Sequence, residues 1–115
     1  MARIRMDFGD ITLWGRIGDD PVGRKFIDCL PRSVDLTRWG QELYGPLGLD
    51  LGEHQPVPDV PSGGIAYSRR GGYLCLFFGQ TPAWPVDIIG RMEEGWKDLD
   101  ERGDLSRVTI SRAEE

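Results

Sequence analysis

The sequence predicts a mainly β protein in which antiparallel strands form a barrel and two short helices close its ends. Most of the chain consists of short apolar runs with strand-like alternation, separated by turns rich in glycine and proline. Two segments depart from this alternation and show the spacing of a one-sided helix. Residues 63–92 contain three strand-like runs and lead into the second helical segment. This order is typical of a barrel closed by helices.

Residues 3–17 are predicted to form a hairpin. Apolar and polar residues alternate in 3–8 and again in 11–17, as in strands with one buried face. Gly9 and Asp10, between the two runs, are typical turn residues. The chain therefore begins with two adjacent antiparallel strands.

The segment 19–31 is predicted to contain the first helix. Val22, Phe26 and Leu30 recur at four-residue intervals and form one apolar face. An acidic pair and a proline precede this face, as at a capped helix start, and a second proline follows it and ends the helix. A helix that is apolar on one side must cover a barrel opening or a sheet face.

A second hairpin is predicted for residues 33–49, with its turn at residues 39–40. A two-residue turn there places Arg38 opposite Gln41, and opposing residues share a face of the sheet. Both then continue the face of Leu43, which we expect to point inward, so the two polar side chains should lie at the rim of the interior. A slip by one residue would reverse every facing.

The next segment, 52–64, is rich in proline and glycine and holds His54, the single histidine of the chain. It is predicted to be a loop long enough to act as a lid or binding loop. Residues 64–79 then form a hairpin around the turn 69–72. Its second strand contains the run YLCLFF, which is apolar on both faces and indicates a strand covered on both sides.

The C-terminal part is predicted to contain a strand at 86–92, the second helix, and a last strand at 107–111. A proline-rich stretch precedes the first of these strands and excludes regular structure there. Gly103 terminates the helix. The apolar face of this helix consists of Met92, Trp96 and Leu99.

Composition narrows the classes of function. At 115 residues, 39% of them hydrophobic and 29% charged, the chain is expected to form one domain spanning residues 1–115. The net charge is −5 and no basic stripe is present, which argues against nucleic-acid binding. Residues 1–15 contain no uninterrupted apolar run for a signal peptide or membrane span, so we expect a cytoplasmic location without a membrane partner. Cys29 and Cys75 are expected to be buried free thiols.

The order of elements resembles that of a cyclophilin, with local likeness in residues 19–30, 86–103 and 107–111. A closer resemblance is to the small prokaryotic cyclophilin-like proteins of unassigned function. Their patterns W-G-x-E-x-Y, G-x-x-x-Y and L-C-L-F-F-G-x-T-P are met at residues 39–44, 63–67 and 74–82. The likeness covers nearly the whole chain and implies a closed, eight-stranded antiparallel barrel capped by two short α-helices.

Cyclophilins accelerate the isomerisation of X-Pro bonds with an apolar proline pocket and an arginine that hydrogen-bonds the proline nitrogen. This chemistry requires differential binding of the twisted amide, without a nucleophile or an acid–base pair. In this chain the characteristic cyclophilin histidine falls at about Val86, and the tryptophan of the same loop has an approximate counterpart in Trp84. The motif around the catalytic arginine is absent. Arg38, expected at the pocket rim, is the candidate catalytic residue.

The favoured hypothesis is a barrel that binds a small organic ligand or an extended, proline-containing peptide without covalent catalysis. Its pocket should lie beside the hairpin 38–44, the segment 77–84 and the loop 52–64. A peptidyl-prolyl isomerase with a rearranged site is one alternative, and a protein-association or homo-oligomerising domain is another. The candidate ligand-binding residues are Arg38, Gln41, Tyr44, Tyr67, Phe78 and Trp84.

Metal and cofactor sites are not expected. A metal site of the cupin type needs several histidines, and the chain has one, His54, which we expect to be solvated. The carboxylates near the proline-rich loop show no spacing that specifies a catalytic pair, and we expect them to be solvated as well. They are Glu42, Asp50, Glu53 and Asp59.

Overall fold

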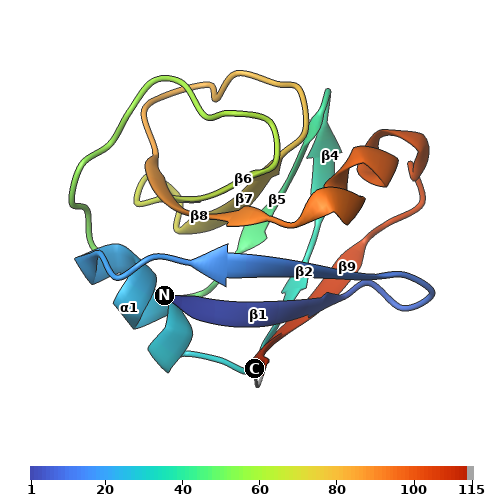
Figure 1. Ribbon diagram of the computed structural model, residues 1–115. Coiled ribbons are helices and arrows are strands. Elements are labelled where there is room, and N and C mark those ends of the chain that lie inside the picture. Colours follow the sequence, from blue (N-terminus) through green and yellow to red (C-terminus); the bar gives the residue numbers. More distant parts are fainter. Residues whose placement is uncertain (114–115) are drawn as a thin grey trace.

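The protein is described by a computed structural model over residues 1–113, which hold one sheet of nine antiparallel strands, an α-helix and a 3₁₀-helix. The two helices, α1 (Pro21–Asp28) and η1 (Glu94–Glu101), lie on opposite sides of the molecule (Figure 1). The strands are β1 (Ala2–Asp7), β2 (Thr12–Ile17), β3 (Arg32–Asp35), β4 (Thr37–Trp39), β5 (Glu42–Pro46), β6 (Gly64–Ser68), β7 (Tyr73–Phe77), β8 (Asp87–Met92) and β9 (Arg107–Arg112).

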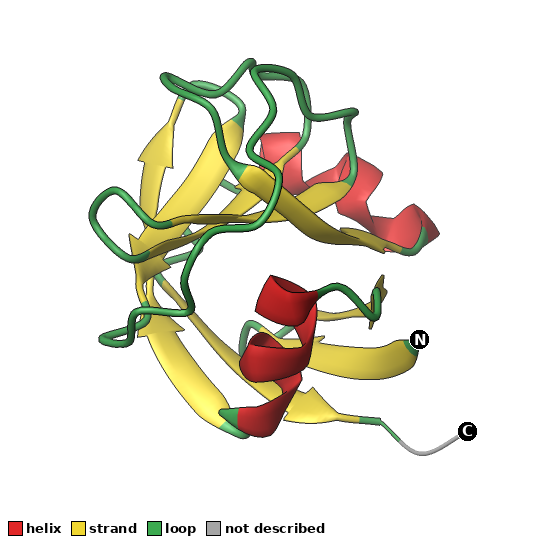
Figure 2. Cartoon of the chain, turned by 90° about the vertical axis from the view of Figure 1, so that its left-hand side faces the viewer, coloured by secondary structure: helices red, strands yellow, loops and turns green. Residues whose placement is uncertain are grey.

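The sheet curls back on itself (Figure 2). Its strand order is β3-β9-β1-β2-β8-β6-β7-β5-β4, and the two end strands, β3 and β4, are separated in the chain only by Leu36. The N–H of Leu36 donates to the carbonyl of Ser106 at 2.8 Å. Strand β3, before Leu36, pairs with β9, and strand β4, after Leu36, pairs with β5. The expected eight-stranded barrel is therefore confirmed, with one strand divided in two.

Gly45 permits the close approach of β5 to β3 at this junction. A Cβ atom at position 45 would collide with the carbonyl oxygen of Asp35 and with the side chain of Val34. Because glycine lacks this atom, the two strands can come together where the barrel closes.

The first helix begins as predicted. Asp20 has an extended backbone and its carboxylate accepts a hydrogen bond from the N–H of Gly23 at 2.8 Å, while Pro21 occupies the first helical position. Val22 and Phe26 are buried in the core. The helix therefore covers one side of the barrel with its apolar face.

The turn of the β4–β5 hairpin differs from the prediction. It lies at Gly40 and Gln41, so that Arg38 opposes Leu43 rather than Gln41. Gly40 has a φ of 59°, a conformation that glycine adopts without steric cost. Because the partner of Arg38 moves by two residues along β5, the expected facing is preserved: Leu43 is buried in the interior and Arg38 lies beside it.

The second helical segment is a 3₁₀-helix rather than the predicted α-helix. Met92 belongs to β8, which leaves Trp96 and Leu99 as its apolar residues; side chains three positions apart eclipse in a 3₁₀-helix and face the core together. The cap residue Glu93 makes no side-chain cap bond, because its carboxylate pairs with Arg3 at 3.0 Å. Neither helix within residues 1–113 has the length and apolar character needed to cross a membrane.

Strand β7 separates two apolar clusters, as its two-sided apolar run predicted. One face contributes Leu74 and Leu76 to the barrel interior. The other face contributes Cys75 and Phe77 to a smaller cluster on the outside of the sheet. This outer cluster is covered by the loop before β6 and the loop after β7, which are joined by two backbone hydrogen bonds between Val57 and Val86 of 2.8 and 3.0 Å.

Candidate functional site

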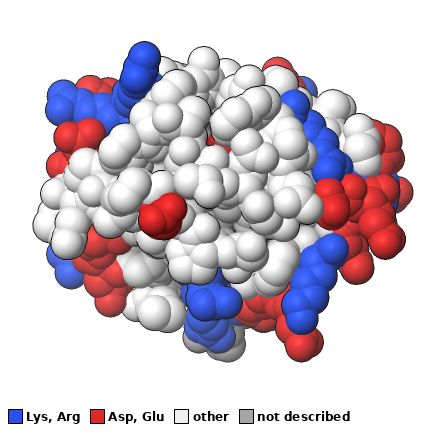
Figure 3. All heavy atoms as spheres, turned by 90° about the horizontal axis from the view of Figure 1, so that it is seen from above, with Lys and Arg blue, Asp and Glu red and all other residues white. Residues whose placement is uncertain are grey.

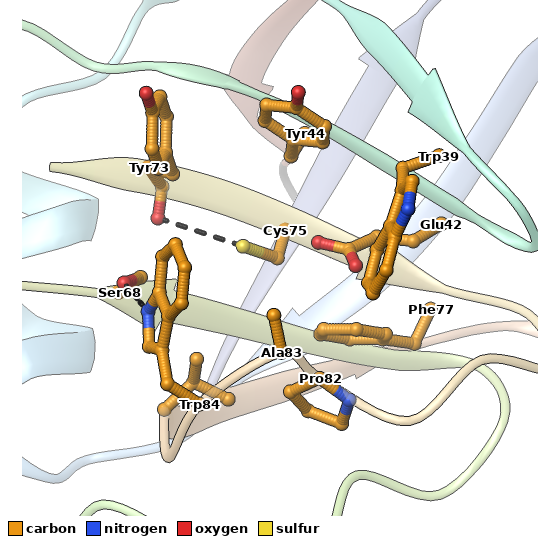
Figure 4. Close-up of a pocket in the computed structure, with 11 residues that line it drawn as sticks. Trp39, Glu42, Tyr44, Ser68, Tyr73, Cys75, Phe77, Pro82, Ala83 and Trp84 are labelled. Carbon is orange, nitrogen blue, oxygen red and sulfur yellow. Dashed lines mark hydrogen bonds between the residues drawn. The ribbon is translucent and has the colours of Figure 1, made fainter. Parts of the chain in front are cut away.

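A pocket of about 250 Å³ lies on the outer face of β5, β6 and β7. Its floor is formed by strand residues and its far wall by the segment 82–86, which crosses over the sheet (Figure 4). Five aromatic side chains line it. The complete lining is Trp39, Glu42, Tyr44, Ser68, Tyr73, Cys75, Phe77, Pro82, Ala83, Trp84 and Val86.

The aromatic walls are held in place by specific contacts. Tyr44 and Tyr73 meet edge to face, with ring centroids 5.3 Å apart. The indole N–H of Trp84 donates to the hydroxyl of Ser68 at 2.7 Å, and the guanidinium group of Arg70 lies 4.4 Å from the centre of the Trp84 ring. The pocket is therefore formed before any ligand arrives.

Glu42 is the single charged residue of the pocket lining. Only 6% of its surface is exposed, and no ion pair reaches it within the described residues 1–113. Burial raises the pKa of its carboxyl group from 4.5 to about 7, and a hydrogen bond with the thiol of Cys75 lowers it by a smaller amount. The expectation that Glu42 is solvated was wrong, because the residue is buried in the pocket between its strand neighbours Trp39 and Phe77.

Cys75 lies opposite Tyr44 on β7 and shares the outer face with Glu42. Burial is the main cause that raises the pKa of its thiol, and the neighbouring negative charge of Glu42 raises it further. The group is therefore a protonated thiol, which is a poor nucleophile. Cys29 and Cys75 are both free, the former half-buried and the latter buried.

The predicted ligand-binding residues divide between the two sides of the sheet. Tyr44 and Trp84 line the pocket. Tyr67 is buried in the interior, where its hydroxyl donates to the carbonyl of Leu49 at 2.8 Å and accepts from the N–H of Leu51 at 3.1 Å. It holds the loop that follows β5.

Arg38, Gln41 and Phe78 come together on the interior side of the sheet, the side expected for Arg38 and Gln41, but they do not line this pocket. The guanidinium group of Arg38 lies 5.2 Å from the centre of the Phe78 ring and donates to the carboxylate of Asp100 at 2.6 Å. It also donates to the carbonyl oxygens of Asp100 and Gly40 at 3.0 and 2.8 Å. The side-chain amide of Gln41 donates to Asp100 at 3.2 Å. These contacts join the β4–β5 hairpin to η1.

The proline-rich loop 52–64 packs behind the segment 82–86. The buried carboxylate of Asp87 accepts hydrogen bonds from the N–H groups of His54 and Gln55, the shortest of 2.6 Å. The side chain of His54 is exposed, as expected. Within the part of the chain that the structure describes, no three His, Cys, Asp or Glu side chains gather where a metal ion would bind.

The surface above the barrel carries few charged side chains at its centre (Figure 3). In the view from above, Lys, Arg, Asp and Glu lie mainly around the margin of this face (Figure 3). The two long loops, residues 47–63 and 78–86, arch over this end of the molecule (Figure 1). The second of them carries the pocket residues Pro82, Ala83 and Trp84.

Together, the closed sheet, its two helical segments and the outer pocket define a small antiparallel barrel protein. Comparison with family models identifies the family: the chain belongs to the cyclophilin-like family, whose model matches residues 2–111. The resemblance found in the sequence is confirmed.

Two solved structures are similar over almost the entire chain. A hypothetical protein from Archaeoglobus fulgidus, whose structure was determined in solution, has 28% sequence identity and a TM-score of 0.76, covering 97% of this chain and 95% of that one. McbB, solved in complex with tryptophan, has 17% identity and a TM-score of 0.77, covering 97% of this chain and 45% of McbB. At that identity the likeness to McbB concerns the fold alone. A comparison with curated proteins found no match.

Proposed function

We propose that the protein binds a small organic ligand in the outer pocket, without covalent catalysis. The observation that carries this proposal is a preformed aromatic pocket with one carboxyl group, that of Glu42, at its base. Concave, mostly apolar sites with few polar groups are the usual form of small-molecule sites. An apolar cavity of about 150 Å³ holds benzene. The volume of about 250 Å³ therefore suits a single ring with a short substituent.

The chemistry of the lining supports non-covalent binding. The thiol of Cys75 is the strongest potential nucleophile in the pocket, and burial keeps it protonated. The hydroxyl of Ser68 is engaged twice, since it donates to the carbonyl of Arg70 at 2.7 Å and accepts from the Trp84 indole. The remaining lining, apart from Glu42, offers apolar surface, aromatic rings and the hydroxyl groups of Tyr44 and Tyr73.

The support for prolyl isomerisation is smaller. A cyclophilin-type site needs a free guanidinium group beside the proline pocket, whereas Arg38 makes three hydrogen bonds on the interior side of the sheet. The position of the cyclophilin histidine is occupied by Val86, an apolar wall residue of the pocket. We therefore place ligand binding ahead of this activity.

The proposed function is tested by a fragment screen with ¹⁵N-labelled protein. Single-ring fragments should shift the amide resonances of β5 and β7 in the wild type. Ala83→Leu fills part of the pocket and should weaken these shifts, whereas Ala2→Leu on β1 should leave them unchanged. If no fragment shifts these amides, or if Ala83→Leu has no effect on the shifts, the pocket is not a ligand site.

A further inference from the structure

We propose that the ligand of this pocket is a small organic ammonium ion with an apolar body, whose charged nitrogen lies against the carboxylate of Glu42 between aromatic rings. This inference rests on the proposed function and deepens it, because it names the chemical class of the ligand.

Glu42 lacks a positively charged partner in the pocket. The residue Glu42 is more than nine-tenths buried, and its carboxyl group points into the pocket (Figure 4). Within residues 1–113 no salt bridge reaches it, and the neighbouring thiol of Cys75, which donates to the carbonyl of Tyr73 at 3.9 Å, carries no positive charge. A buried carboxylate without a cation is costly, and a bound cation removes that cost. A ligand that carries an ammonium group therefore supplies what the site lacks.

Aromatic rings flank Glu42 on both sides. Trp39 lies directly opposite Glu42 on β4, and Phe77 lies directly opposite it on β7. Opposing residues on one face of a sheet are nearest neighbours, so the carboxylate stands between two aromatic side chains. Tyr44 and Tyr73 extend this wall. The faces of aromatic rings attract cations, particularly where water is excluded.

Other charged and titratable groups near Glu42 do not supply this cation. From β7 the titratable neighbours are Cys75 and Tyr73, and from β5 the neighbour is Tyr44; none of them is a cation. The segment 82–86 contributes no charged side chain. Arg70 lies on the ring of Trp84 rather than in the pocket lining. Above about pH 7, where Glu42 is ionised, an anionic ligand would meet its charge, and a neutral ligand would leave that charge unpaired.

The proposal predicts how affinity depends on pH. In the ligand-free protein, burial holds the carboxyl group of Glu42 protonated below a pH of about 7, and an ammonium ligand has to displace that proton. An alkylammonium group stays charged up to about pH 10. The affinity should therefore rise as the pH increases from about 5.5 to about 8.5, whereas a neutral ligand that accepts a hydrogen bond from the protonated carboxyl group should bind more weakly over the same range.

Three probes of the same shape test the ligand class: phenethylamine, phenethyl alcohol and hydrocinnamate. Their affinities are measured by calorimetry and by amide shifts on β5 and β7 at about pH 8. We expect the amine to bind at least about tenfold more tightly than the alcohol, and the carboxylate to bind least. Nα-acetyl-lysine methylamide presents the same ammonium group on a peptide unit. If it binds more tightly than phenethylamine, the small-molecule part of the proposal is overturned.

The variant Glu42→Gln removes the charge and keeps the shape of the side chain. It should reduce the affinity for phenethylamine to that for the alcohol, while Glu94→Gln, an exposed site on η1, should have no effect. The pH dependence of amine binding to the wild type tests the same point without a substitution. Equal affinity for amine and alcohol, an unchanged affinity in Glu42→Gln, or no binding of the amine would overturn the inference. Fragment binding at the pocket would still support the proposed function in each case.

Discussion

The buried carboxyl group of Glu42 predicts an unusual dependence of stability on pH. Its pKa is raised from 4.5 to about 7 in the folded protein. Between these values the folded state holds a proton that the unfolded state has released, so the free energy of unfolding falls as the pH rises through this window. Glutamine does not titrate. The variant Glu42→Gln should therefore lack this loss and should be more stable than the wild type above pH 7.

The size of the effect follows from the two pKa values. A tenfold change in the acid constant corresponds to about 1.4 kcal/mol, which gives an upper limit of about 3.5 kcal/mol for the rise from 4.5 to about 7. The pocket opens to solvent, and water screens part of the buried charge. We expect Glu42→Gln to be more stable than the wild type by about 1–2 kcal/mol at about pH 8.5 and nearly equal to it at about pH 4.5.

Urea unfolding followed by tryptophan fluorescence measures the difference at each pH, with Glu94→Gln as the control. The titration of three other acidic groups, Asp19, Glu93 and Asp104, does not obscure the effect of Glu42 in this pH range. Hydrogen bonds with the N-terminal amine, Arg3 and Arg102 lower their pKa values, so the stability that they contribute is lost only at more acid pH. The reasoning is refuted if Glu42→Gln is no more stable than the wild type at about pH 8.5, or if the difference is the same at both ends of the range.

Three further predictions concern packing and reactivity. Tyr67→Phe removes both hydrogen bonds of a buried hydroxyl and should lower the free energy of unfolding by about 1–3 kcal/mol in urea, so an unchanged value would contradict the role given to it. Gly45→Ala should cost about 1–3 kcal/mol because its Cβ meets the facing strand, whereas Gly103→Ala, which meets nothing within 4 Å, should change stability by less than about 0.5 kcal/mol; equal effects would contradict this account. Cys29 should react faster than Cys75 with a disulfide reagent at about pH 8, and a ligand in the pocket should slow the reaction of Cys75 selectively. A faster reaction of Cys75 would contradict its placement in the pocket.

Local patterns were sufficient to predict most of the fold. Alternation identified the strands, and the acidic cap with its following proline located the start of α1. The division of one strand at Leu36 was not visible, since it depends on a hydrogen bond to Ser106, far along the chain. The type of η1 was missed because Met92 was assigned to the helix, although pairing with Gly15 on β2 holds it in β8.

The candidate site was predicted less well, for a physical reason. The run YLCLFF indicated a strand covered on both faces, which is the environment of Cys75 and Phe77. The same logic, applied across the hairpin, places Glu42 on the outer face with Tyr44. What turns this face into a pocket is the segment 82–86, which lies over it. That contact is set by tertiary packing, and no local pattern specifies it.

The residues first assigned to ligand binding still bear on the site through the hairpin that they hold. Arg38 and Gln41 anchor the β4–β5 hairpin to Asp100 on η1 from the interior side. The same hairpin carries Trp39 and Glu42 on its outer side. Because successive strand residues face opposite sides, one short segment both fastens the barrel and builds the pocket wall. A substitution at Arg38 therefore acts on the pocket through the position of the hairpin, whereas a substitution at Glu42 changes the chemistry of the pocket itself.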